Sequence, residues 1–322
     1  MQTILRLVFV ASAALLIAAP ASAQPAYPSK PVRFLVGAPA GGSNDIFARA
    51  LSQRLAEALG QPVIVDNRPG ASQMIAADLT AKAPPDGHTL YMTSTTYTTG
   101  AALMAKLPFD PVNDLTGITM IARGPMVLVV HPSVPAKTVK ELIAVARARP
   151  GQLNYTSSGI GGINHFGVEV LKSMAHIDMV HVPHKGMGPA ITDLMAGQMQ
   201  VLLVSLAAVE TQMQSGRLRA IGVSSPKRSS FLPNLPAIAE TLPGYDNDLW
   251  WGVFTAAKTP RPVVDRLNSE LHKVMATDEM KKRFAEFGAE QAPTTPEAFA
   301  LLVKNEIAKW SKVIKTANIK PE

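Results

Sequence analysis

The chain contains no cysteine among its 322 residues. A disulfide framework, cysteine metal ligands and lipid attachment through a cysteine are therefore excluded. The fold has to rely on a hydrophobic core instead. A composition of 47% hydrophobic and only 17% charged residues is typical of a globular protein, and the length is sufficient for two domains of ordinary size.

Long apolar runs and clusters of basic residues are also missing from most of the chain. After the first 23 residues no segment has 18 consecutive apolar residues, so no membrane-spanning helix is predicted. The formal net charge is +7, but the basic residues are scattered, with no run of five or more. A nucleic-acid partner is therefore not expected.

Several motifs that carry chemistry are incomplete. The dinucleotide pattern G-x-G-x-x-G is approached at Gly159-Ile160-Gly161-Gly162-Ile163, but Asn164 stands where the last glycine belongs. The phosphate loop fails because Ser43 follows Gly42 where lysine is required. The nucleophile elbow G-x-S-x-G does not occur. We expect no cofactor and no catalytic residues.

A histidine group raises the question of a metal site. His176, Asp178, His181 and His184 lie close in sequence, but His181 and His184 point to opposite faces of an extended strand. The zinc motif H-E-x-x-H is absent. These histidines are expected at the surface or at a strand end, without a metal.

The first 23 residues have the pattern of a secretory signal peptide. Arg6 provides the basic region, residues 7–19 are apolar, and Ala21-Ser22-Ala23 is a small-residue cleavage site before Gln24. The sequence therefore predicts a protein of the periplasm whose signal peptide is removed.

A glycine-rich stretch between a predicted strand and a predicted helix is the main candidate for a binding site. The strand is expected at 32–36 and the helix at 46–59, where apolar residues recur every four positions. Glycines let an anion approach the unpaired N–H groups of a helix start. The same pattern occurs in ordinary turns, so this stretch alone leaves both interpretations open. The candidate ligand-binding residues here are Ala40, Gly41, Gly42, Ser43, Asn44 and Asp45.

The same arrangement returns about 120 residues later. A strand is expected at 153–155 and a helix at 163–174, and Gly161 is expected to correspond to Gly42. Two helix starts in two halves of the chain favour a two-lobed clamp on an anion. His165 is expected either to donate to a ligand carboxylate or to have a capping or packing role. The candidates in this second stretch are Ser157, Ser158, Gly159, Gly161, Gly162, Asn164 and His165.

Strands and helices alternate through the remaining chain, which predicts an α/β fold with mostly parallel sheets. Residues 93–100 are expected to form a hydroxyl-rich loop at the end of a strand. Trp250 and Trp251 are expected either to pack in the core together or to leave one of the two available for the ligand, with packing of both as the default. Two helices are expected near the C-terminus. Strands are expected at 62–65, 89–92, 127–130, 179–182, 200–205 and 248–254, and helices at 74–82, 138–148, 189–196, 262–276 and 296–317.

Seven short blocks give the chain a resemblance to a known family. It resembles the periplasmic solute receptors of tripartite tricarboxylate transporters, the Bug-type receptors, and the blocks follow the family's order along nearly the whole mature chain. They are Tyr27-Pro28-Ser29-Lys30-Pro31, Ala40-Gly41-Gly42-Ser43-Asn44-Asp45, Asn67-Arg68-Pro69-Gly70-Ala71, Pro85-Asp86-Gly87-His88-Thr89-Leu90, Leu107-Pro108-Phe109-Asp110-Pro111, His181-Val182-Pro183-His184-Lys185-Gly186 and Leu242-Pro243-Gly244-Tyr245.

The resemblance implies a two-lobed periplasmic-binding-protein fold with the ligand cleft between the lobes. Lobe one would comprise 24–125 and 247–322, and lobe two 126–246. A small organic carboxylate would be held by the two glycine loops, with Thr93, Thr95 and Ser205 as further contacts. The implied partner is a membrane permease with a large and a small subunit, and the receptor would be a monomer.

Some positions depart from the family pattern and leave the ligand open. Many members have Pro-Phe-Ala-Ala in place of Gly37-Ala38-Pro39-Ala40, a tyrosine in place of His184, and an acidic residue in place of Val204. Two alternatives are an exported enzyme acting on carboxylic acids and a receptor that presents its ligand to a membrane sensor.

Overall fold

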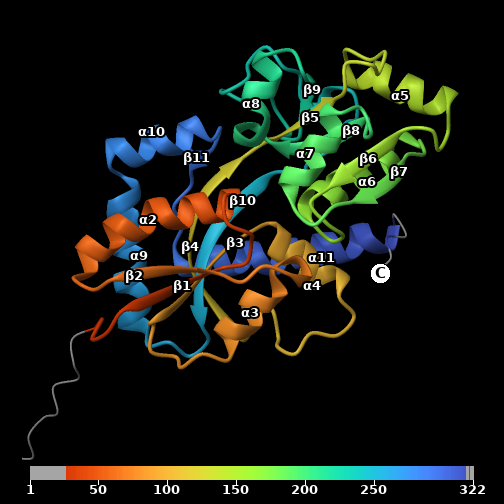
Figure 1. Cartoon of the computed structure of the whole chain (residues 1–322). Helices are drawn as coiled ribbons and strands as arrows, with labels where there is room; N and C mark the ends of the chain where they lie inside the picture. The colour runs from red at the N-terminus through yellow and green to blue at the C-terminus, as the bar shows by residue number, and fades with distance from the viewer. Residues whose placement is uncertain (1–26, 317–318, 320–322) are drawn as a thin grey trace, which may run out of the picture.

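A computed structural model describes residues 27–316 and residue 319. The predicted signal peptide, residues 1–23, lies outside the described residues. Figure 1 shows two α/β lobes, each built on its own sheet, with helix α11 extending from behind the first sheet to below α6 of the second lobe. The chain has the two-lobed periplasmic-binding-protein fold expected from the sequence.

The first sheet has six strands in the order β11-β4-β10-β3-β1-β2. Strand β1 pairs in parallel with β2 and with β3, whereas β10 runs antiparallel to both β3 and β4. The strands are β1 (Val32–Val36), β2 (Val63–Asn67), β3 (Thr89–Ser94), β4 (Leu115–Gly124), β10 (Leu249–Ala256) and β11 (Glu290–Gln291).

Helices cover this sheet, and α2 (Ser43–Leu59) shows why they form. Phe47, Leu51 and Leu55 follow one another at four-residue spacing and are fully buried. The helix ends at Gly60, whose φ of 70° is the left-handed conformation of a helix C-cap. The other helices are η1 (Ala71–Gln73), α3 (Met74–Ala81), α4 (Thr96–Leu103), α9 (Arg261–Met275), α10 (Asp278–Glu286) and α11 (Pro296–Thr316).

The second sheet has five strands in the order β7-β6-β8-β5-β9. Strand β6 pairs in parallel with β7 and β8, and β5 runs antiparallel to β8 and β9. The elements are β5 (Met126–Val130), α5 (Val139–Ala148), β6 (Asn154–Ser157), α6 (Ile163–Ala175), β7 (Val180–Pro183), α7 (Met187–Met195), β8 (Val201–Ser205), α8 (Leu206–Gln214), β9 (Arg219–Val223) and η2 (Ile238–Glu240).

The chain passes from the first sheet to the second after Gly124 and returns between Val223 and Leu249. The returning segment packs on α6, where the Tyr245 hydroxyl donates to the carbonyl of Gly167 at 3.0 Å. Of the helices described, none has the length and apolar character needed to cross a membrane.

Both sheets are mixed, so the prediction of mostly parallel sheets was wrong. The first strand after each passage of the chain between the lobes runs antiparallel to its neighbours. These strands are β5 in the second sheet and β10 in the first. Strand β4 and helix α10 had not been predicted. Helix α10 is polar over much of its length and starts from the side-chain cap of Thr277.

The predicted loop at 93–100 was also wrong, because β3 continues to Ser94 and α4 starts at Thr96. The hydroxyl of Thr98 donates to the carbonyl of Thr95 at 2.8 Å, so the threonine side chains bond back onto the helix instead of facing water. Tyr97 and Thr99 are fully buried. Trp250 and Trp251 are both buried, as expected.

Candidate ligand-binding site

Two glycine loops, one from each lobe, have the same backbone conformation where each of them enters its helix. The first glycine loop (residues 37–45) joins β1 to α2, and the second (residues 157–165) joins β6 to α6. Gly41 and Gly161 have φ of 81° and 78°, a conformation that favours glycine. Gly42 and Gly162 follow as extended N-caps with φ of −76° and −71°.

The structural equivalent of Gly42 is therefore Gly162, and that of Gly161 is Gly41. The expected correspondence of Gly42 with Gly161 was shifted by one residue. A glycine pair followed by any residue and asparagine, as in Gly41-Gly42-Ser43-Asn44, has its counterpart in Gly161-Gly162-Ile163-Asn164. The two asparagines are each 3% exposed.

Neither helix start is closed by the side chain of its own N-cap, since both N-caps are glycines, Gly42 in α2 and Gly162 in α6. In α6 the first N–H, that of Ile163, donates instead to the Thr96 hydroxyl at 3.5 Å. By contrast, the hydroxyls of Thr138 and Thr277 accept a backbone N–H at the starts of α5 and α10. The first N–H groups of a helix lack internal partners and carry partial positive charge, so both glycine loops suit an anionic group.

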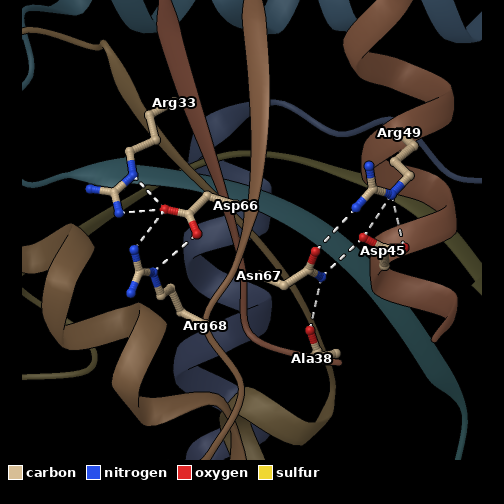
Figure 2. A network of polar contacts seen from close by, with 7 residues as sticks. All are labelled: Arg33, Ala38, Asp45, Arg49, Asp66, Asn67 and Arg68. Atoms are coloured by element: carbon tan, nitrogen blue, oxygen red, sulfur yellow. Dashed lines mark hydrogen bonds and ion pairs between the residues drawn. The ribbon is translucent and has the colours of Figure 1, made fainter. Parts of the chain in front are cut away.

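Asp45 holds the first glycine loop in shape (Figure 2). Its carboxylate accepts the Gly41 N–H at 2.9 Å, the Arg49 guanidinium at 3.0 Å and the Asn67 amide at 3.0 Å. Asn67 also donates to the carbonyl of Ala38. Burial alone would raise the pKa of Asp45, but these hydrogen bonds and the charge of Arg49 outweigh it and lower the pKa. The carboxylate is thus charged and already engaged within the loop.

A buried polar network lies beneath the same loop. Asn44 donates to the side-chain oxygen of Gln73 at 3.1 Å, and Thr93 donates to the same oxygen. The Gln73 amide donates to Ser94 at 3.2 Å, and the Tyr91 hydroxyl donates to the Gln73 carbonyl at 3.0 Å. Thr93 therefore reaches the first glycine loop through Gln73, a residue that the sequence had not singled out.

A stack of three rings supports the second glycine loop. The ring centroids of His165 and His181 are 4.1 Å apart, and those of His181 and Tyr155 are 4.7 Å apart. His165 accepts the Gly161 N–H at its Nδ1 atom (3.3 Å), as Asp45 does for Gly41. Burial and the charge of Lys172 lower the pKa of His165 to about 4, so the imidazole is neutral and able to accept. The alternative of a capping role for His165 therefore matches the geometry.

His181, expected at the surface or at a strand end, is half-buried within β7. Burial and the neighbouring His165 lower its pKa to about 3. Its Nε2 lies 2.7 Å from the Ser157 hydroxyl, a distance that also fits a nucleophile and its base. Ser157 is fully buried and donates to the Gly159 carbonyl at 3.0 Å. Its hydroxyl therefore stabilises the second glycine loop.

The remaining candidate residues differ in how they relate to the two glycine loops. Ser43 accepts a hydrogen bond from the Trp251 indole at 3.1 Å, and Ser158 donates to Asn164 at 3.3 Å. Thr95 is buried at the crossing strand, where its hydroxyl accepts the Trp250 N–H. No hydrogen bond joins Ser205, the N-cap of α8, to either glycine loop within residues 27–316. In the same range no group of three histidine or acidic side chains is arranged to hold a metal ion.

Lobe-one hydroxyls contact the second glycine loop directly. Ser72 donates to the carbonyl of Ile160 and Thr99 to the carbonyl of Gly161, each at 2.7 Å. The two lobes therefore meet at the loop itself. Sequence reasoning missed Ser72, Gln73 and Thr99 because neither their spacing nor their residue type marks them.

Comparisons with known proteins match this architecture. The model of the tripartite tricarboxylate transporter family receptor matches residues 47–319. Protein BugT of Bordetella pertussis is 34% identical over 318 residues, which cover 97% of this chain and 96% of BugT.

Two solved structures from Rhodopseudomonas palustris are similar as well. Rpa4515, solved with adipate, has a TM-score of 0.86 and 35% identity, and the match covers 92% of this chain and all of that one. MatC, with bound malate, has a TM-score of 0.81 and 28% identity, covering 89% of this chain and all of MatC. The match is to a family of periplasmic binding proteins and not of enzymes. The chain belongs to the tripartite tricarboxylate transporter family of receptors.

Proposed function

We propose that this protein is a periplasmic receptor that closes its two lobes on a small linear dicarboxylate. One carboxylate would bind at the first glycine loop and the other at the second. Lobe one would comprise residues 24–125 and 247–322, and lobe two residues 126–246. The observation that carries the proposal is the shared geometry of the two loops, each of which ends in a glycine N-cap that has no capping side chain of its own.

The electrostatics of the loops support an anionic ligand that needs no metal or cofactor. The negative charge of Asp45 is paired with Arg49, and His165 is neutral. Partial charges of the helix starts then remain as the local attraction for a carboxylate. The residues proposed to contact or shape the ligand site are Ala40, Gly41, Gly42, Ser43, Asn44, Asp45, Thr93, Thr95, Ser157, Ser158, Gly159, Gly161, Gly162, Asn164, His165 and Ser205.

The relatives and this geometry together support the proposed ligand class. Rpa4515 was solved with adipate and MatC with malate, both of which carry two carboxylates. Delivery would be to a membrane permease with a large and a small subunit, after export of the receptor with a cleaved signal peptide. Closure of two lobes on a ligand is the common movement of periplasmic binding proteins.

A thermal-shift series tests the ligand class. Adipate and malate are compared with adipamide and dimethyl adipate, which keep the carbon chain but lack the charges. A ligand present at about 100 times its dissociation constant stabilises the fold by roughly 2.7 kcal/mol. We expect the free acids to raise the melting temperature and the neutral analogues to leave it unchanged. Equal stabilisation by adipamide would rule out charge recognition.

A further inference from the structure

The short helix η1 has an unusual backbone between the two glycine loops. Ala71, Ser72 and Gln73 have φ of 46°, 49° and 74°. Residues with a side chain disfavour this left-handed region, and three in succession are held only where the surroundings fix them. Such a strained segment is reason to look for a function.

Gln73 is fixed from the side of the first glycine loop. Its side-chain oxygen accepts from Asn44, and its backbone carbonyl accepts from Tyr91. A Cβ atom at Gly37 would lie 2.7 Å from the Cβ of Gln73, so the start of this loop has no room for a side chain. Gln73 of η1 therefore packs directly against the first glycine loop.

Ser72 faces the opposite way, into the second glycine loop. Its hydroxyl donates to the Ile160 carbonyl at 2.7 Å, and a Cβ atom at Gly161 would lie 2.8 Å from that hydroxyl oxygen. A Cβ atom at Gly100 would lie 2.8 Å from the Cβ of Ser72. Ser72 thus fills the space between α4 and the second glycine loop.

The peptide unit between Ile160 and Gly161 is held at both ends. Its carbonyl accepts from Ser72 of the other lobe, and its N–H donates to His165 of its own lobe. Because a peptide unit is planar, fixing the carbonyl also fixes the direction of the N–H. The next carbonyl, that of Gly161, accepts from Thr99. Two successive peptide planes leading into α6 are therefore oriented by hydroxyls of lobe one.

We propose that Ser72 and Gln73 form a coupler that ties the second glycine loop to the first when the lobes close. Gln73 anchors the coupler on Asn44, and Ser72 sets the peptide planes in front of α6. The role of the coupler in ligand retention rests on the proposed function. Its role in closure does not, because the hydrogen bonds of Ser72 and Thr99 join the two lobes directly and involve no ligand atom.

The absence of cysteine makes the closure measurement direct. Gln53→Cys on α2 and Ala144→Cys on α5, both at exposed positions in different lobes, accept a pair of spin labels without competing thiols. Distance distributions are recorded without ligand for the labelled parent, Ser72→Ala and Ser72→Gly. Adipate release is measured by stopped-flow mixing of the unlabelled proteins.

Ser230→Ala is the matched control. Ser230 is exposed and also donates between the two lobes, to Glu290 at 2.9 Å, but it lies away from the glycine loops. The coupler predicts that both Ser72 variants shift the distances toward an open form and release adipate about 3- to 10-fold faster, as expected for one lost hydrogen bond. Ser72→Gly should melt higher than Ser72→Ala because glycine relieves the backbone strain. Ser230→Ala should release adipate at the parent's rate.

Two results would overturn the coupler. One is a distance distribution in Ser72→Ala that superimposes on the parent's, and the other is an equal acceleration of adipate release by Ser230→Ala. Failure of the parent itself to bind adipate would count against the proposed ligand class alone. In that case the distances measured without ligand still decide whether Ser72 holds the lobes together.

Discussion

At the scale of single residues, Asp45 and His165 hold equivalent peptide N–H groups with different chemistry. A charged carboxylate paired with Arg49 supports the first glycine loop, and a neutral imidazole supports the second. The carboxylate stays charged as pH falls, because its pKa is lowered. The imidazole has to stay neutral, since a protonated Nδ1 cannot accept a hydrogen bond.

This difference predicts an acid sensitivity that originates in lobe two. Unfolded chains take up a proton on histidine near pH 6.5, whereas folded His165 remains neutral down to about 4. The unfolded state therefore binds more protons between these values, and the free energy of unfolding falls as pH is lowered through this window. The contribution of His165 is on the order of 3 kcal/mol.

Urea unfolding at pH 7, 5.5 and 4 measures the effect, with His165→Gln as the comparison. Glutamine keeps a neutral acceptor for the Gly161 N–H and does not titrate. We expect the variant to lose distinctly less stability on acidification than the parent. An identical pH dependence in both proteins would show that His165 is not the group responsible.

The equivalence of Gly42 and Gly162 provides a symmetric test of the two loops. Both have φ that alanine adopts freely. A Cβ atom at Gly42 would lie 3.3 Å from the Pro39 carbonyl, and one at Gly162 would lie 2.7 Å from the side-chain oxygen of Asn164, which would have to shift. Each methyl group would obstruct a helix start. We expect about 10- to 100-fold weaker adipate binding in either variant, as for one lost charge-assisted hydrogen bond.

Isothermal titration of Gly42→Ala and Gly162→Ala, with circular dichroism to confirm folding, makes this measurement. Gly161 is unsuitable for the comparison, because its φ of 78° would strain any side chain and its Cβ would meet Ser72. Normal affinity in Gly162→Ala with impaired Gly42→Ala would reduce the site to one lobe.

At the scale of elements, the strand–loop–helix units were predictable because their signals are local. The β1–α2 and β6–α6 units each combine a short strand, a pair of glycines and a helical periodicity within about 20 residues, although only β1 is apolar. Helix α4 was not predictable in this way. Its threonines resemble a solvated loop, and only burial of Tyr97 and Thr99 against the rest of the lobe makes the helix favourable.

The segment that returns from the second sheet to the first packs against α6 at Gly167. We therefore expect replacement of this glycine by alanine to destabilise the protein, contrary to the usual effect inside a helix. Replacing glycine by alanine inside a helix usually stabilises it by about 1 kcal/mol. At Gly167 a Cβ atom would lie 2.2 Å from the Asn247 side-chain nitrogen and 2.3 Å from the Leu203 Cδ2 atom. Gly167→Ala should therefore lower the free energy of unfolding by about 1–3 kcal/mol, as overpacking does.

Gly188→Ala is the matched control, since Gly188 lies in α7 and a Cβ atom there would have no neighbour within 4 Å. Urea denaturation should show Gly188→Ala at least as stable as the parent and Gly167→Ala clearly less stable. A stabilised Gly167→Ala would mean that the crossing segment moves away from α6 easily.

At the scale of the whole molecule, the sequence predicts two lobes but not how they touch. The two glycine loops were recognisable from composition, whereas the contacts of Ser72 and Thr99 with the second loop join residues 88 and 62 positions apart. Long-range contacts of this kind depend on the path of the crossing strands. The order of the strands could not be predicted from the sequence either. Antiparallel β10 joins the first sheet only after the chain has passed through the second lobe.

A closing receptor should become more compact when its ligand binds. If binding energy shifts an open population to the closed one, the radius of gyration from small-angle scattering should fall at saturating adipate and stay constant with adipamide. The hydrogen bonds of Ser72 and Thr99 join the two lobes and are expected to stabilise the compact form. Thr99→Val keeps the side-chain shape but removes the donor to Gly161, so the variant should need more adipate to reach the same compact form. A radius that is already minimal without ligand, and unchanged in Thr99→Val, would show that the lobes are held together by other contacts and that the ligand enters a preformed cleft.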